Sequence, residues 1–87
     1  MPTPDILRAH RHSIRHRGEV TGSSQCGCFF CCHIFEPDDM KTWVDEHEGV
    51  GQTALCPRCG IDSVIGSESG YPITAEFLAA MKAHWFW

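Results

Sequence analysis

The chain has 87 residues, a length that suits one domain and leaves room for only a thin core. Hydrophobic residues make up 43% of it and charged residues 21%, which excludes a fully disordered protein. The formal net charge is −4 at pH 7, but residues 1–25 hold four of the seven Lys and Arg residues and only two of the 11 Asp and Glu residues. Residues 26–87 are therefore acidic, which excludes most of the surface as a binding site for a phosphate backbone.

No apolar run as long as a signal peptide or a membrane span occurs in the sequence. We therefore expect a cytoplasmic protein that makes no membrane contact. Thiols stay reduced in that compartment, so the six cysteines are expected to bind a metal, with disulfide bonds as the alternative.

The N-terminal part combines a helical pattern with a basic charge. Residues 5–17 are predicted to form a helix that ends at Gly18 and is followed by a short linker over 21–24. Its less polar face consists of Ile6, Leu7, His10 and Ile14. We expect residues 1–25 to form a basic helix or arm with a linker.

The middle of the chain is rich in cysteine. Residues 26–35 are dense in cysteine and phenylalanine and should be substantially buried. Pro37 and the apolar spacing after it predict a helix over 37–47 that ends at Gly49. The segments 52–56 and 61–65 are predicted to pair as a hairpin with two cysteines at its tip.

The last part of the chain reads as a loop over 66–72 followed by a helix over 75–86. Thr74 is the expected N-cap, and Ile73 is expected to pack on Leu78 as a hydrophobic staple. The expected buried residues of this helix are Phe77, Leu78, Met81, Trp85 and Phe86.

The strongest motif is a pair of Cys-x2-Cys turns, Cys28 with Cys31 and Cys56 with Cys59, separated by 24 residues. Two residues between cysteines let the chain turn tightly, so that both sulfurs face one ion. Gly60 permits the positive backbone φ that such a turn often needs. The pattern predicts one structural Zn²⁺ held by all four cysteines, with iron as the alternative metal.

Three further potential ligands lie next to the first pair of cysteines. Cys26 or Cys32 could replace one of the assigned thiolates, and His33 could supply an imidazole in place of a sulfur. Otherwise, a free cysteine in this position is a small buried apolar residue. Oxidation of these thiols with loss of the metal is a further alternative.

Together the elements predict an α+β domain over residues 26–87 that is zinc-ribbon-like and centred on the metal, with a treble clef as the alternative. The placement of the second cysteine pair on a hairpin, and not at the start of a helix, favours the ribbon.

The motifs also resemble those of a family of small bacterial cytoplasmic proteins with paired Cys-x2-Cys turns. The similarity rests on Cys26-Gly-Cys-Phe-Phe-Cys31, on Trp43, on the segment from Gly51 to Gly66 around Cys-Pro-Arg-Cys-Gly, on the segment from Ser69 to Thr74 and on the aromatic C-terminal residues. It covers nearly the whole chain. It implies a cytoplasmic location and no particular activity, because the family's label carries none.

We expect a non-enzymatic binding module whose partner is a protein or a second copy of the chain. The large aromatic residues near the C-terminus support this, because one face of a helix cannot bury Trp85, Phe86 and Trp87 together. Nucleic-acid binding through the Arg- and His-rich residues 8–17 is the alternative. A metal-dependent nuclease of the HNH type is a further alternative, although the segment 52–65 lacks the histidine base that such a site needs.

Overall fold

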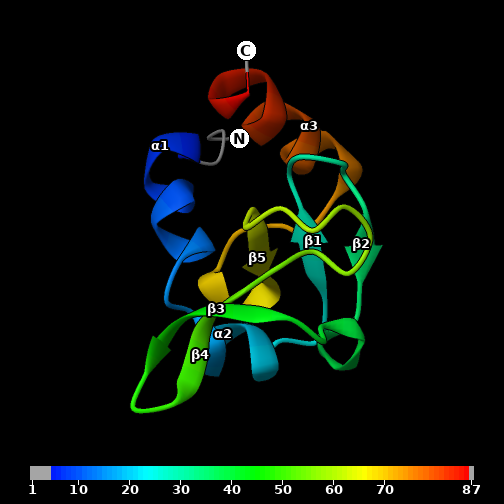
Figure 1. Cartoon of the computed structure of the whole chain (residues 1–87). Helices are drawn as coiled ribbons and strands as arrows, with labels where there is room; N and C mark the ends of the chain where they lie inside the picture. Colours follow the sequence, from blue (N-terminus) through cyan, green and yellow to red (C-terminus); the bar gives the residue numbers. More distant parts are fainter. Residues whose placement is uncertain (1–4, 87) are drawn as a thin grey trace.

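Two small antiparallel sheets and a C-terminal helix organise the protein, as seen in a computed structural model that describes residues 5–86 (Figure 1). The three-stranded sheet has the order β2-β1-β5, and the two-stranded sheet pairs β3 with β4. The strands are β1 (Cys26–Cys28), β2 (Ile34–Phe35), β3 (Trp43–His47), β4 (Val50–Ala54) and β5 (Val64–Gly66). This mixture of helix and sheet confirms the α+β class.

Helix α3 (Ala75–Trp85) forms where the sequence predicts it. The Thr74 hydroxyl accepts a hydrogen bond from the backbone N–H of Phe77 at 3.1 Å, which satisfies one of the free amides of the first turn. Phe77, Leu78 and Met81 are buried, as expected. Trp85 is only half-buried and Phe86 is exposed.

The predicted helix over 5–17 is wrong in its length. The chain forms α1 (Ile6–Ala9), a 3-10 turn (His10–Ser13) and α2 (Arg17–Thr21). Arg15 interrupts the helical path with a φ of 48°, and Gly18 lies inside α2 and does not end a helix. Leu7 and Ile14 of the expected apolar face are exposed, at 59% and 49% of their surface.

Residues 15–17 instead run along β4. The backbone N–H of His16 donates to the carbonyl of Gln52 at 2.8 Å, and the backbone N–H of Arg15 donates to the Thr53 hydroxyl at 2.8 Å. The Arg17 guanidinium donates to the carbonyl of Gly51 at 2.7 Å and lies 4.4 Å from the centre of the Trp43 ring. This segment is therefore part of the packed structure.

The predicted helix over 37–47 is also wrong. Residues Pro37–Asp39 form a 3-10 turn, and after an irregular stretch over 40–42 the chain forms strand β3. Glu48 and Gly49 both take positive φ values, 52° and 82°, and reverse the chain directly into β4. The local spacing of apolar residues is outweighed by this tight turn and by the strand pairing that it permits.

The predicted hairpin of 52–56 with 61–65 does not form. β4 pairs with β3, whereas β5 pairs with β1, so the two segments belong to different sheets. The second cysteine turn therefore lies in the connection between the two sheets.

The core has two apolar clusters. One lies around the cysteine turns and contains Val20, Cys26, Cys28, Phe35, Met40, Ala54, Cys56 and Val64. The other lies under α3 and contains Ala9, Phe29, Ile65, Ile73, Phe77, Leu78 and Met81. Each fully buried large side chain stabilises the folded state by about 1.5–3 kcal/mol. A chain this short buries few of them, so the stabilisation from its core is modest. Within residues 5–86, no helix has the length and apolar character that a membrane span requires.

Candidate metal centre

Two turns carry the four cysteines. Cys28 ends β1, and its backbone N–H donates to the carbonyl of His33 at 2.9 Å, which closes the first turn around Cys31. In the second turn the backbone N–H of Cys56 donates to the carbonyl of Ile61 at 3.0 Å. Gly60 follows Cys59 with a φ of 77°, as its position in the motif predicts.

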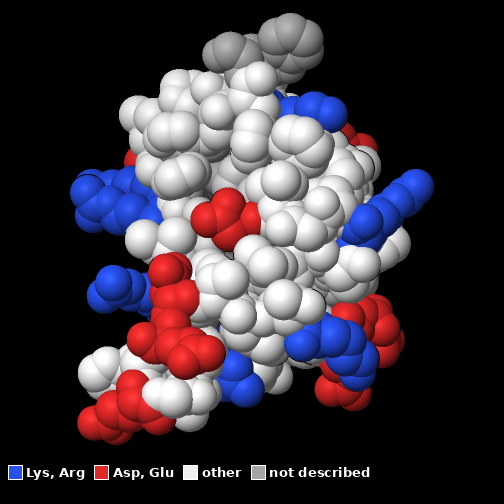
Figure 2. Space-filling model, viewed as in Figure 1, with Lys and Arg blue, Asp and Glu red and all other residues white. Residues whose placement is uncertain are grey.

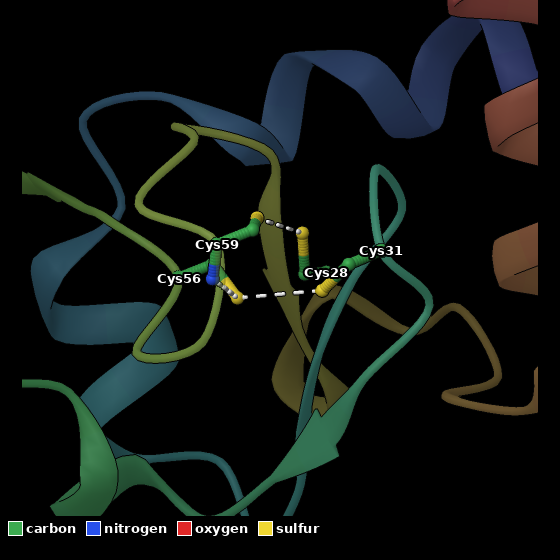
Figure 3. Close-up of side chains that lie close together, drawn as sticks. All are labelled: Cys28, Cys31, Cys56 and Cys59. Atoms are coloured by element: carbon green, nitrogen blue, oxygen red, sulfur yellow. Dashed lines mark hydrogen bonds between the residues drawn. The ribbon is translucent and has the colours of Figure 1, made fainter.

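The structure brings the four assigned sulfurs together (Figure 3). All four Sγ atoms lie within 4.8 Å of one another. Cys28 Sγ is 3.6 Å from Cys59 Sγ, and Cys31 Sγ is 3.7 Å from Cys56 Sγ. A tetrahedral ion with metal–sulfur bonds of about 2.3 Å holds its sulfurs roughly 3.8 Å apart. The group can therefore hold a metal ion, and its closed set of four thiolates suits a structural ion.

Hydrogen bonds to sulfur are concentrated on one cysteine of each turn. Cys28 Sγ accepts from the backbone N–H of Phe30 at 3.4 Å and lies 3.3 Å from the buried Ser63 hydroxyl. Cys56 Sγ accepts from the backbone N–H groups of Arg58 at 3.4 Å and Cys59 at 3.5 Å. Such donors stabilise thiolates over thiols and spread the negative charge of a four-thiolate site.

The pKa values of the thiols follow from burial and from these donors. Burial raises the pKa of Cys28 and the pKa of Cys59. Burial also acts to raise the pKa of Cys56, but the backbone N–H groups of Cys59 and Arg58 and the neighbouring thiols of Cys31 and Cys59 together outweigh it, and the net pKa of Cys56 is lowered. Because thiolates are the metal-binding form, binding of an ion would displace the protons that burial favours on Cys28 and Cys59.

The three spare ligands lie outside the four-sulfur group. Cys26 is fully buried, and its thiol donates to the carbonyl of Val20 at 3.6 Å; burial raises its pKa to about 11. Cys32 takes a φ of 61° and packs against the cluster under α3. The His33 ring stacks on Phe35 with 5.6 Å between ring centres.

The structure also places the basic residues that were predicted to contact nucleic acid and two of the aromatic residues that were predicted to contact a protein. Of residues 8–17, His16 and Arg17 are used in packing on β4, whereas Arg8, Arg11 and Arg15 are exposed. The Trp85 indole N–H donates to the carbonyl of Ile6 at 3.2 Å. Trp87 lies outside the described residues.

Sequence reasoning did not identify the contact of the Ser63 hydroxyl with Cys28 Sγ. The signal that could have identified Ser63 is its place four residues after Cys59, directly before the buried strand β5. Comparison of the chain with protein-family models, with curated proteins and with solved structures gave no match.

Proposed function

We propose that the protein is a zinc-stabilised cytosolic binding module without catalytic activity. The observation that carries the proposal is the convergence of four cysteine sulfurs within 4.8 Å. Four thiolates fill a tetrahedral shell and leave no position for a reacting water, which is the arrangement of structural zinc sites. The cytosolic location rests on the family resemblance and on the free thiols.

A tetrahedral shell of four thiolates suits zinc and iron alike, and zinc is proposed because no further feature of the chain favours iron. Native mass spectrometry of protein purified without chelators measures the metal and its stoichiometry. One zinc per chain is the expected result. One iron per chain, with the visible absorption of an iron–thiolate site, would replace zinc in the proposal, and a chain without bound metal would overturn it.

A zinc-ribbon-like fold is proposed from the placement of the turns. The first turn lies in the hairpin of β1 and β2, and the second leads into β5, which pairs with the other side of β1. A treble clef would place the second cysteine pair at the start of a helix, whereas here a strand follows it.

The proposed partner is a protein, either a second copy of the chain or another polypeptide. Phe30 at the tip of the first turn and Phe86 after α3 are both exposed, at 37% and 39%, and their rings meet edge to face with 4.9 Å between centres. Exposed paired aromatic rings are typical of protein contact sites. Replacing both with Ser should abolish association in sedimentation measurements while leaving the zinc content unchanged.

Nucleic-acid binding through residues 8–17 is the second candidate. The favouring observation is the exposure of Arg8, Arg11 and Arg15 along one segment. Figure 2 shows basic side chains on the α1 side of the molecule and acidic side chains around the β3–β4 hairpin. Binding of this kind would weaken steeply as salt increases, and an affinity independent of salt would exclude it.

A further inference from the structure

The N-terminal helices and the loop before α3 enclose an open hollow of about 490 Å³. Its lining residues are Arg8, Arg11, His12, Ser69, Gly70 and Tyr71. None of the four clustered cysteines lines it, so the hollow is separate from the candidate metal centre.

One wall of the hollow is cationic. Arg8 and Arg11 come from consecutive turns of the N-terminal segment, and both side chains are exposed. His12 is oriented by Glu19, whose carboxylate oxygens lie 2.9 and 3.1 Å from its Nδ1 atom. That contact leaves Nε2 as the remaining hydrogen-bonding atom of the ring.

The facing wall is built on a turn with fixed geometry. The Ser69 hydroxyl donates to the carbonyl of Gly66 at 2.6 Å and accepts from the backbone N–H of Tyr71 at 3.2 Å. The Tyr71 ring stacks on Phe77 with 5.8 Å between centres, and the His12 ring lies 5.7 Å away. These contacts hold the tyrosine in place beside the cationic wall.

Two carboxylates neighbour the cationic wall, and both have partners. Asp5 caps α1 by accepting from the N–H groups of Leu7 and Arg8, and its second oxygen lies 3.6 Å from Arg8 Nε on the exposed surface. Glu19 faces His12. Neither acid lines the hollow, whose own lining carries basic, hydroxyl-bearing and backbone groups only.

We propose that this hollow binds a small phosphorylated ligand, with the phosphate on Arg8, Arg11 and His12 and the remainder against Ser69–Tyr71. Guanidinium groups match the tetrahedral oxygens of phosphate by paired hydrogen bonds. A phosphate monoester offers one terminal oxygen more than a carboxylate to the two guanidinium groups, and the P–OH of its monoanion can donate to the free Nε2 of His12. The acidic remainder of the chain disfavours a long phosphate backbone and favours a compact ligand.

The test is an NMR titration of the zinc-loaded full chain with inorganic phosphate, adenosine 5′-monophosphate and adenosine at constant ionic strength. We expect phosphate and the nucleotide to shift the signals of His12 and Tyr71, and adenosine to leave them unchanged. Arg8→Gln and Arg11→Gln should each weaken binding roughly tenfold, because each removes a charge-assisted pair. Lys41→Gln, which removes the same charge from an exposed site outside the hollow, should bind like the parent.

Binding that is equal for the parent and Arg11→Gln would overturn the proposal, as would the same signal shifts produced by chloride alone. If a short RNA without a terminal phosphate binds while inorganic phosphate and the nucleotide do not, the residues of the hollow are part of a nucleic-acid site. That result would reject the small phosphorylated ligand. The zinc content and backbone spectrum of each variant are measured alongside, so a failure of this site is distinguished from a failure of the metal centre.

Discussion

The Nε2 atom of His16 accepts a hydrogen bond from the backbone N–H of Ala54, with 3.1 Å between the two nitrogens. Its Nδ1 atom donates to the carbonyl of His12 at 2.6 Å, so the ring is neutral with its proton on Nδ1. His16 is almost completely buried, at 4% exposure. One side chain thus connects the turn between α1 and α2 with strand β4, two residues before Cys56.

Replacement of His16 by Ala should lower the free energy of unfolding by about 2–3 kcal/mol, because it leaves the buried N–H of Ala54 and the half-buried carbonyl of His12 without their partner. His16→Gln provides an amide that can both donate and accept, and should cost less. Chemical denaturation of the zinc-loaded variants measures both effects. Equal stability of His16→Ala and the parent would show that these two hydrogen bonds contribute nothing.

Burial also lowers the pKa of His16 from its ordinary value of 6.5. In the unfolded chain this histidine takes up a proton near pH 6.5, whereas in the folded protein it remains neutral to lower pH. The unfolded state is therefore favoured as pH falls below 6.5, and stability is retained above it. Acid also protonates thiolates in both proteins, so the quantity to measure is the difference in the free energy of unfolding between the parent and His16→Gln. This difference should shrink below pH 6.5.

Cys56→Ser should abolish cooperative unfolding, because it breaks the four-thiolate shell. Structural zinc supplies roughly 10–16 kcal/mol of apparent binding free energy, as much as the whole stability of a small domain. Cys32→Ser is the matched control, since Cys32 lies outside the cluster, and it should unfold like the parent. A chelator strong enough to remove the metal should have the same effect on the parent as the Cys56 substitution, and calorimetry follows all three.

Ser63→Ala should weaken metal retention by roughly tenfold while preserving the fold, because it removes the hydroxyl beside Cys28 Sγ. Ser24→Ala removes an exposed hydroxyl that lies beside Ser67 and should leave retention unchanged. Competition with a chromogenic chelator measures both. Identical retention in the two variants would contradict a role for Ser63 at the metal centre.

Gly51→Ala should be strongly destabilising, because an added Cβ would lie 2.4 Å from Trp43 Cβ and 3.2 Å from its backbone carbon. Gly18→Ala is the opposite case. Gly18 lies in α2 with no neighbouring atom within 4 Å of an added Cβ, so alanine should stabilise the helix by about 0.5–1 kcal/mol. Thermal denaturation of the pair should give shifts of opposite sign.

Helix α3 could be predicted from sequence because its signals are local. Thr74 caps it, and its apolar residues recur with helical spacing. The pairing of the cysteines within each turn was likewise encoded locally, where spacing alone brings two sulfurs to one side, and the prediction that both turns share one ion came from the ligand number that a tetrahedral metal requires. In both cases the information lies within a few residues of the element.

The segment from Trp43 to His47 shows why other elements could not be predicted. Its side chains are mostly exposed, so no alternation of buried and exposed residues marks it as a strand. Its conformation is set by pairing with β4, and β4 in turn is held by His16, far away in sequence. The break at Arg15 has the same origin, because it allows residues 15–17 to follow β4.

The second cysteine turn has a mechanical consequence. It connects β4 of one sheet to β5 of the other, while Cys28 and Cys31 belong to the three-stranded sheet. An ion at the four sulfurs would thus cross-link the two sheets, which share no backbone hydrogen bonds within the strand pairings of residues 5–86. Without it, the β3–β4 hairpin would be held to the rest of the protein by residues 15–17 and by the packing of Ala54 and Trp43 in the first core cluster, and the 55–63 connection would be free to bend.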